Sequence, residues 1–229
     1  MTTTTPSLLE RSDTRTAAPA EATRLQAPPT CRMFETPIIE KFSRVHPIAP
    51  FVFWVPVLGY FLVRAIVAGV AVWSVAALFV AGAFLWSLTE YLLHRFVFHK
   101  IGPRFVARRM FFILHGVHHD YPQDTTRLVM PLGVSIPIGV ICYLVLRYTV
   151  GLANPTLVDP MFVGFGAGYL AYDGIHYATH HFKMTSRLGK WLKRHHMVHH
   201  FTGENARWGV SSPLWDWVFG TMGSSAPRD

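Results

Sequence analysis

The 229-residue chain has few charged residues and almost no cysteine. Only 15% of its residues are Asp, Glu, Lys or Arg, against about 25% in a typical soluble domain. Its two cysteines, Cys31 and Cys142, lie far apart in segments of different character. Neither a disulfide nor a cysteine-based zinc motif is therefore expected. Residues 1–30 are rich in Thr, Ala and Pro and contain no apolar run typical of a cleavable signal peptide.

The chain contains several long apolar segments. Residues 65–89 contain no charged side chain and are long enough to cross a bilayer, which takes about 20 residues. Three further apolar segments cover residues 47–62, 128–148 and 155–172. The first of these is short and contains proline, so it is expected to be tilted or to pair with residues 65–89 as a hairpin. The pattern predicts an all-α integral membrane protein with about four transmembrane helices.

The basic residues predict the orientation of these spans. All of the 21 Lys and Arg residues except Arg64 and Arg147 lie in residues 1–44, 90–127 or beyond 175. Four spans place these three segments on one face, which the positive-inside rule makes cytoplasmic. The net charge of +8 does not indicate a nucleic-acid partner, because basic residues that border membrane spans are explained by anionic headgroups.

Two parts of the chain are expected from this pattern. Residues 1–45 are interpreted as a basic N-terminal tail that is disordered to about residue 33, followed by a short amphipathic segment at the membrane surface. Residues 46–229 form the membrane-embedded domain, with a helical cap on the cytoplasmic side.

Histidine is the residue that stands out. All 13 histidines except His46 fall into four clusters. The clusters are His94 and His99; His115, His118 and His119; His176, His180 and His181; and His195, His196, His199 and His200. Imidazole is the commonest metal ligand among side chains, and residues three or four apart share one face of a helix. The clusters therefore predict a metal site on the cytoplasmic side.

The spacing within the first cluster is unusual. His94 and His99 are five residues apart, which places them on different faces of a regular α-helix. One of them is expected at a helix end or in a locally distorted turn.

About ten imidazole ligands are too many for one metal ion, so two ions are predicted. Imidazole suits iron, zinc, copper and nickel alike. Iron is favoured because a two-metal site facing a membrane suggests oxidation of an unactivated lipid C–H bond, and zinc has no redox chemistry. Purified protein is still expected to hold zinc in some preparations, since zinc outcompetes Fe²⁺.

Carboxylates close to the clusters are candidates to hold the second ring nitrogen of a ligand. They are Glu90, Asp120 and Asp173. For Asp120 the alternative is a solvated loop residue. An unpaired Asp173 near the end of an apolar span would be costly, which favours a functional role.

The segment after the second cluster offers candidate contacts to a lipid headgroup or carboxylate: Tyr121, Asp124 and Arg127. The alternative for Arg127 is a cation that reaches the membrane edge. Near the C-terminus, Trp208, Trp215, Asp216 and Trp217 are expected to cover the site or to lie at the membrane interface.

The order and spacing of the boxes, H-x4-H, H-x2-HH, H-x3-HH and H-x2-HH, resemble those of the fatty acid hydroxylase/sterol desaturase superfamily of membrane oxygenases. Three stretches are similar to the fatty acid 2-hydroxylase branch in particular: LHGVHHDYPQDTTRLVMP at 114–131, AYDGIHYATHH at 171–181, and RHHMVHHF with GVSSPLWDWVFGT between 194 and 221. The resemblance spans about residues 85–221.

The resemblance implies a dimetal site, O₂ as co-substrate and hydroxylation of an acyl chain at C2. The implied ligands are His94, His99, His115, His118, His119, His176, His180, His196, His199 and His200. His181 and His195 are then left over, although spacing alone leaves His195 open because it is four residues from His199. Many eukaryotic relatives carry an N-terminal cytochrome b5 domain. Only about 45 residues precede the first span here, which implies a separate electron donor of the ferredoxin or cytochrome b5 type.

Two alternatives remain at this point. One is an enzyme of the same superfamily that oxidises a sterol, carotenoid or other rigid lipid, or that desaturates, since the box spacing is shared widely. The 114–131 stretch favours the acyl chain. The other is a membrane metal-binding or transport protein without catalysis, but a transport path needs ligands near the midplane of the membrane and the histidines lie on one side.

Overall fold

The computed structural model describes residues 30–99, 104–202 and 205–223. Every regular element in these ranges is helical, as the sequence predicts. The longer helices are α3 (Ala49–Val67), α4 (Val72–Leu93), α7 (Leu132–Tyr148), α9 (Val158–His181) and α10 (Arg187–Phe201). The shorter ones are α2 (Pro37–Phe42), α5 (Phe105–Phe111), α6 (Val117–Asp120), α8 (Val150–Ala153), α11 (Leu214–Val218), the π-helices η1 (His94–Phe98) and η2 (Phe112–Gly116), and the 3₁₀ turn η3 (Pro155–Leu157).

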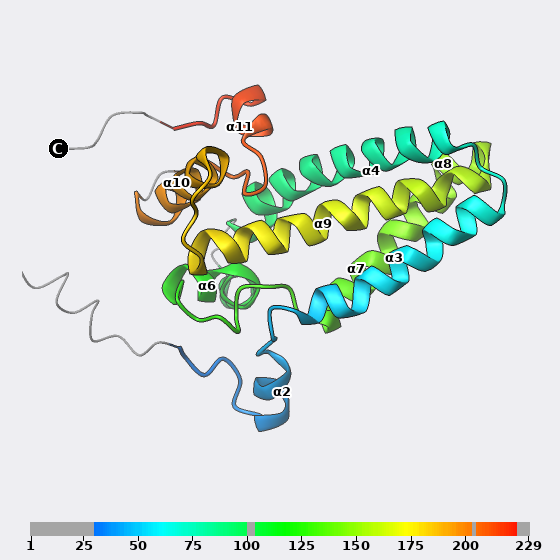
Figure 1. Cartoon of the computed structure of the whole chain (residues 1–229). Helices are drawn as coiled ribbons and strands as arrows, with labels where there is room; N and C mark the ends of the chain where they lie inside the picture. Colours follow the sequence, from blue (N-terminus) through cyan, green and yellow to red (C-terminus); the bar gives the residue numbers. More distant parts are fainter. Residues whose placement is uncertain (1–29, 100–103, 203–204, 224–229) are drawn as a thin grey trace, which may run out of the picture.

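Helices α3, α4, α7 and α9 run alongside one another, and helices α6, α10 and α11 gather at one end of them as a cap (Figure 1). Helix α9 lies at the centre and packs against both α3 and α4. Aromatic rings fill the space between these helices: Trp86 on α4 meets Phe165 on α9 edge to face, with ring centroids 5.2 Å apart. The C-terminal ends of α4 and α9 therefore enter the cap together.

Helices α4 and α9 approach each other backbone to backbone at two glycines. A Cβ atom added to Gly164 would lie 1.9 Å from the carbonyl oxygen of Phe79, and one added to Gly82 would lie 2.0 Å from that of Met161. Small residues allow such close contact between membrane helices, where packing rather than hydrophobic burial drives association. The glycine pair sets the distance between α4, which leads directly into His94, and α9, which carries His176.

The structure supports part of the predicted membrane topology. Two helical stretches are long and apolar enough to cross a membrane, Ala49–Val67 and Val72–Phe98. Only 22% and 11% of their most apolar windows are buried, so they do not resemble the core helices of a soluble protein. Helix α7 is apolar but shorter, and α9 does not meet the same criterion.

The boundaries of the first two spans differ from the prediction. The break between the helices falls at residues 68–71 and not near residue 63, so Arg64 lies in the last turn of α3. Gly69 adopts a φ of 75°, which a glycine accepts without steric cost and which turns the chain back. Arg64 is held at this position by an ion pair with Asp159, at the start of α9.

Residues 30–45, which the sequence assigned to the tail, contact the loop after the second histidine box. Arg127 is buried and pairs with Glu40, while it also donates to the hydroxyl of Ser43 at 2.8 Å and to the carbonyl of Cys31 at 3.0 Å. Its guanidinium is thus occupied by the protein itself, which corrects both the predicted headgroup contact and the membrane-edge alternative. Residues 1–29 of the predicted tail lie outside the described residues.

Candidate metal centre

Ten histidines gather in the cap as two groups of five. Within each group the ligand nitrogens all lie within 4.8 Å of one another. The first group is His94, His99, His115, His119 and His199, and the second is His118, His176, His180, His196 and His200. These are the ten residues that the resemblance implies as ligands.

Helical spacing explains how neighbouring histidines divide between the groups. His115 and His119 are four residues apart and belong to the first group, and His196 and His200, also four apart, belong to the second. His118 lies between His115 and His119 in the sequence but belongs to the second group. His199 lies between His196 and His200 but belongs to the first group. The two groups are therefore adjacent and share α6 and α10.

The π-helix η1 brings His94 and His99 into one group. In a regular α-helix, residues five apart are rotated by about 140°, because each turn takes about 3.6 residues. The π-helix bonds residue i to i+5 and so widens the turn. His94 begins η1 and His99 follows its last residue, and the rings lie 5.0 Å apart between centroids. The predicted distortion is confirmed. A second π-helix, η2, carries His115.

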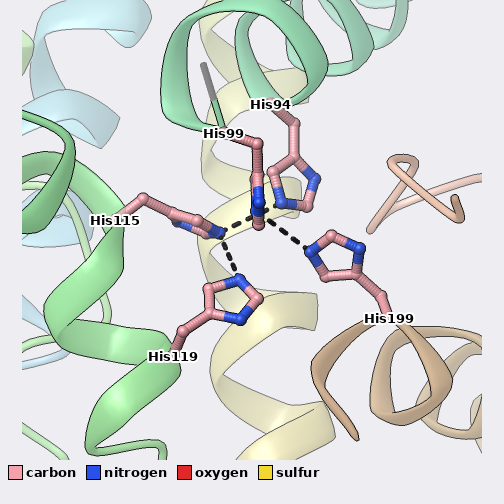
Figure 2. Close-up of side chains that lie close together, drawn as sticks. All are labelled: His94, His99, His115, His119 and His199. Carbon is pink, nitrogen blue, oxygen red and sulfur yellow. Dashed lines mark hydrogen bonds between the residues drawn. The ribbon is translucent and has the colours of Figure 1, made fainter. Parts of the chain in front are cut away.

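In the first group the imidazoles point toward one another from three segments of the chain (Figure 2). The Nε2 atom of His115 lies 3.0 Å from that of His94 and 2.9 Å from that of His119. The Nε2 atoms of His199 and His99 are 3.1 Å apart.

The second group has the same arrangement. The Nε2 atom of His118 lies 3.0 Å from that of His176 and 3.1 Å from that of His200. The Nε2 atom of His196 lies 3.0 Å from that of His200 and 2.9 Å from that of His180.

These separations fit nitrogens that surround a metal ion. An imidazole nitrogen binds a metal at about 2.1 Å, so two of them at right angles are about 3.0 Å apart, whereas at the tetrahedral angle they are about 3.4 Å apart. The observed separations of 2.9–3.1 Å match the right angle. The closest nitrogens in each group therefore have the spacing of neighbouring ligands around one ion.

Two ring nitrogens of the first group are fixed by backbone carbonyls. The Nδ1–H of His94 donates to the carbonyl of Trp208, and that of His199 donates to the carbonyl of Ala206 at 2.9 Å. A neutral imidazole has one N–H, so with Nδ1 protonated the Nε2 atom of both rings is unprotonated and faces the group. This is the tautomer that binds a metal through Nε2.

Burial keeps the rings in the neutral form. Removal from water, together with the neighbouring imidazoles, lowers the pKa of His99 to about 3 and that of His119 to about 2. Burial also lowers the pKa of His199 to about 4, although the Ala206 carbonyl opposes the shift. Neutral imidazole is the form that binds metals, so the groups are ready for a cation at physiological pH.

The predicted carboxylate partners are not bonded to histidines in the described part of the chain. Glu90 is buried but accepts from the amides of Val210 at 2.7 Å and Ser211 at 2.8 Å. Backbone carbonyls, and not Glu90, bond to His94 and His199. Asp120 is exposed, which agrees with the alternative of a solvated residue. Asp173 is buried three residues before His176 without a hydrogen bond to it.

The remaining predicted residues lie beside the groups. Tyr121 is half-buried, and Asp124 is buried and accepts from the amide of Thr126 at 2.9 Å, which stabilises the turn before Arg127. His181 and His195 belong to neither group.

The sequence did not indicate the part played by Asp216. This residue is fully buried and accepts from the amides of Trp208 and Gly209, each at 2.8 Å, and from Nε2 of His195 at 3.2 Å. Burial raises the pKa of Asp216, but these hydrogen bonds outweigh it and hold the pKa below its usual value. The only signal was its place in the GVSSPLWDWVFGT stretch. The Trp208 ring covers the first group as expected, 4.9 Å from His99 and 5.2 Å from His199 between centroids.

An apolar pocket lies between α3, α4, α7 and α9. It is lined mainly by aromatic and aliphatic side chains, among them Trp54, Trp86, Ile138, Phe162 and Leu93. Leu93 directly precedes His94, so the pocket reaches the chain segment that enters the first group.

Comparisons with known proteins agree with this geometry. Residues 79–221 match the family model described as "Fatty acid hydroxylase". The chain is 34% identical over 178 residues to the dihydroceramide fatty acyl 2-hydroxylase FAH1 of Arabidopsis thaliana, covering 77% of this chain and 74% of the relative. It is also 34% identical to the fatty acid 2-hydroxylase of Homo sapiens, covering 86% of this chain and 58% of the relative. Among solved structures, the hydroxylase domain of scs7p superposes with a TM-score of 0.76 at 32% identity, covering 83% of this chain and 72% of that one.

Proposed function

The chain belongs to the fatty acid hydroxylase family of oxidoreductases, and on that premise we propose that it hydroxylates a lipid acyl chain at C2 as a dimetal oxygenase. The observation that carries the proposal is the pair of adjacent five-histidine groups, each with converging nitrogens. The names of the relatives, a dihydroceramide fatty acyl 2-hydroxylase and a fatty acid 2-hydroxylase, support the acyl chain over a sterol or carotenoid and hydroxylation over desaturation.

The ten grouped histidines are the proposed ligands of two iron ions, with zinc in their place in some purified protein. The right-angled nitrogen separations favour an ion that accepts more than four ligands. Bound iron supplies the activation of O₂ that cleavage of an aliphatic C–H bond requires. The reaction takes one C–H bond, O₂, two electrons and two protons to one C–OH group and water. The two electrons come from a separate donor of the ferredoxin or cytochrome b5 type.

The protein's own residues orient and shield the reacting carbon. The apolar pocket between the long helices accommodates the acyl chain, which leaves water and gains dispersion contacts with Trp54, Trp86 and Phe162. The rings of Trp208 and Phe98 lie against the first group and reduce access of water to it. A chain held in the pocket therefore presents its polar end toward the cap.

The proposed setting is a membrane, with α3, α4, α7 and α9 as four spans and the cap on the cytoplasmic side. The two long apolar helices and their exposed side chains support insertion. The basic segments at 90–127 and beyond 175 both border the cap end, which supports the cytoplasmic side.

Lipid profiling tests the function directly. A host that lacks 2-hydroxylated lipids should gain 2-hydroxy acyl chains when it expresses this protein under O₂, because the grouped histidines provide the site for that chemistry. Mass spectrometry of released fatty acids locates the hydroxyl group. A desaturated chain, a hydroxysterol or an oxidised carotenoid as the sole new product would contradict the assignment.

A further inference from the structure

Residues 206–211 form a segment without regular secondary structure, and its two sides have different partners. On one side, the carbonyls of Ala206 and Trp208 accept from the Nδ1 atoms of His199 and His94. On the other, the amides of residues 208–211 all donate to two buried carboxylates, Asp216 and Glu90. The segment thus stands between two carboxylates and the first histidine group.

One peptide unit links Asp216 to His94 directly. The carbonyl of Trp208 and the amide of Gly209 belong to the same planar unit. Its N–H donates to Oδ2 of Asp216 at 2.8 Å, and its C=O accepts from Nδ1 of His94. Hydrogen bonds in such a chain polarise one another, so the carboxylate charge strengthens the carbonyl as an acceptor. A glycine is required here, since a Cβ atom on Gly209 would lie 2.0 Å from the carbonyl oxygen of Ser212.

A second, longer link reaches His199. The carbonyl of Ala206 and the amide of Arg207 form one peptide unit, and that amide donates to the carbonyl of Thr221 at 2.8 Å. Thr221 in turn donates its amide to the carbonyl of Asp216 at 2.7 Å and its hydroxyl to Oδ1 at 2.8 Å. Asp216 thus also helps to hold Thr221, whose carbonyl accepts from the peptide unit beside His199, although this link is less direct than the one to His94.

The second histidine group has no such link. In the described residues, neither Asp216 nor the 206–211 segment bonds to any of its members, whose contacts are among themselves. The network is therefore specific to one of the two groups.

We propose that Asp216 is a positioning residue for the first metal only, acting through the Trp208–Gly209 peptide to orient His94 and increase its strength as a ligand. The inference rests on the proposed function, because it takes the two groups as two metal sites. A carboxylate that accepts a hydrogen bond directly from a metal-binding histidine raises the affinity for the metal by about tenfold to a hundredfold. Here the carboxylate of Asp216 acts on His94 through one peptide unit.

The test is Asp216→Asn in the full chain, purified in detergent micelles and titrated with Co²⁺ against a competing chelator. We expect the affinity of one site to fall by about tenfold or more while the other stays unchanged. His199→Ala and His200→Ala, which each damage one group, identify the affected site as the first. The matched control is Asp159→Asn, which removes a buried carboxylate at the opposite end of α9 and should leave both affinities as they are.

Three outcomes overturn the inference: equal loss at both sites, loss at the second site alone, or two unchanged affinities. If Asp216→Asn does not fold, chelation of the wild-type protein decides. A chelator should remove Co²⁺ in two phases, with the first site releasing its ion more slowly, so the slower phase should be absent from His199→Ala. A single phase in the wild-type protein, or loss of the faster phase in His199→Ala, contradicts the proposal. A wild-type protein that binds no Co²⁺ would instead contradict the proposed function.

Discussion

Changing His118 and His119 together to alanine should abolish the 2-hydroxy acyl product. His118 belongs to the second group and His119 to the first, so this pair of adjacent substitutions removes one ligand from each metal site. Removing a residue that only holds a metal ligand in place lowers metal affinity or activity by about tenfold to a hundredfold. Removing the ligands themselves should lower activity further. We expect the product to fall by at least about a hundredfold in lipid profiles of expressing cells.

The control for that experiment is His46→Ala. This histidine is exposed and lies outside both groups, so its removal should leave the product unchanged. Equal amounts of membrane-inserted protein must be confirmed for each variant. An undiminished 2-hydroxy product in the double variant would mean that the histidine groups are not the catalytic site.

Gly164→Ala adds only one methyl group but should strongly destabilise the fold. The new methyl group would lie 1.9 Å from the carbonyl oxygen of Phe79, and a backbone atom cannot rotate aside as a side chain can. Helices α4 and α9 would have to separate, which costs about 1–3 kcal/mol in an overpacked core and more where the backbone moves. Thermal unfolding in detergent, followed by the loss of the monodisperse peak in size-exclusion chromatography, measures the change.

The matched variant is Gly133→Ala in the first turn of α7, where a Cβ atom meets nothing within 4 Å. An alanine there is neutral or stabilising by up to about 1 kcal/mol, because glycine is the poorer helix former. A Gly164→Ala protein as stable as the Gly133→Ala protein would show that α4 and α9 do not meet at this point.

The sequence predicted the gathering of the histidines well, because the spacing that indicates it is local. Helical spacing of three and four residues identified His115, His118 and His119 as one ligand-bearing segment, and the five-residue spacing of His94 and His99 indicated the distortion that became η1. Among the ten implied ligands, the pairs four apart, His115 with His119, His176 with His180 and His196 with His200, each fall into one group. Spacing alone left His195 open, because it is four residues from His199, and its partner Asp216 is distant in sequence.

Contacts between distant segments account for what the sequence missed. A carboxylate one turn before His94 is a natural candidate to hold that ring, yet Glu90 bonds to the amides of Val210 and Ser211. Arg127 likewise directly precedes the apolar segment 128–148 in sequence, but its partner Glu40 comes from the N-terminal side. The end of the first span was misplaced for a similar reason, since the ion pair of Arg64 with Asp159 allows a charge inside α3.

Metal analysis of the protein purified without oxygen tests the central claim most directly. Two groups of five converging imidazoles predict two metal ions for each chain. Elemental analysis by mass spectrometry, normalised to protein by amino-acid analysis, should therefore give about two equivalents of iron, or of iron and zinc together. A single equivalent that does not rise when Fe²⁺ is added in excess would contradict the dimetal site.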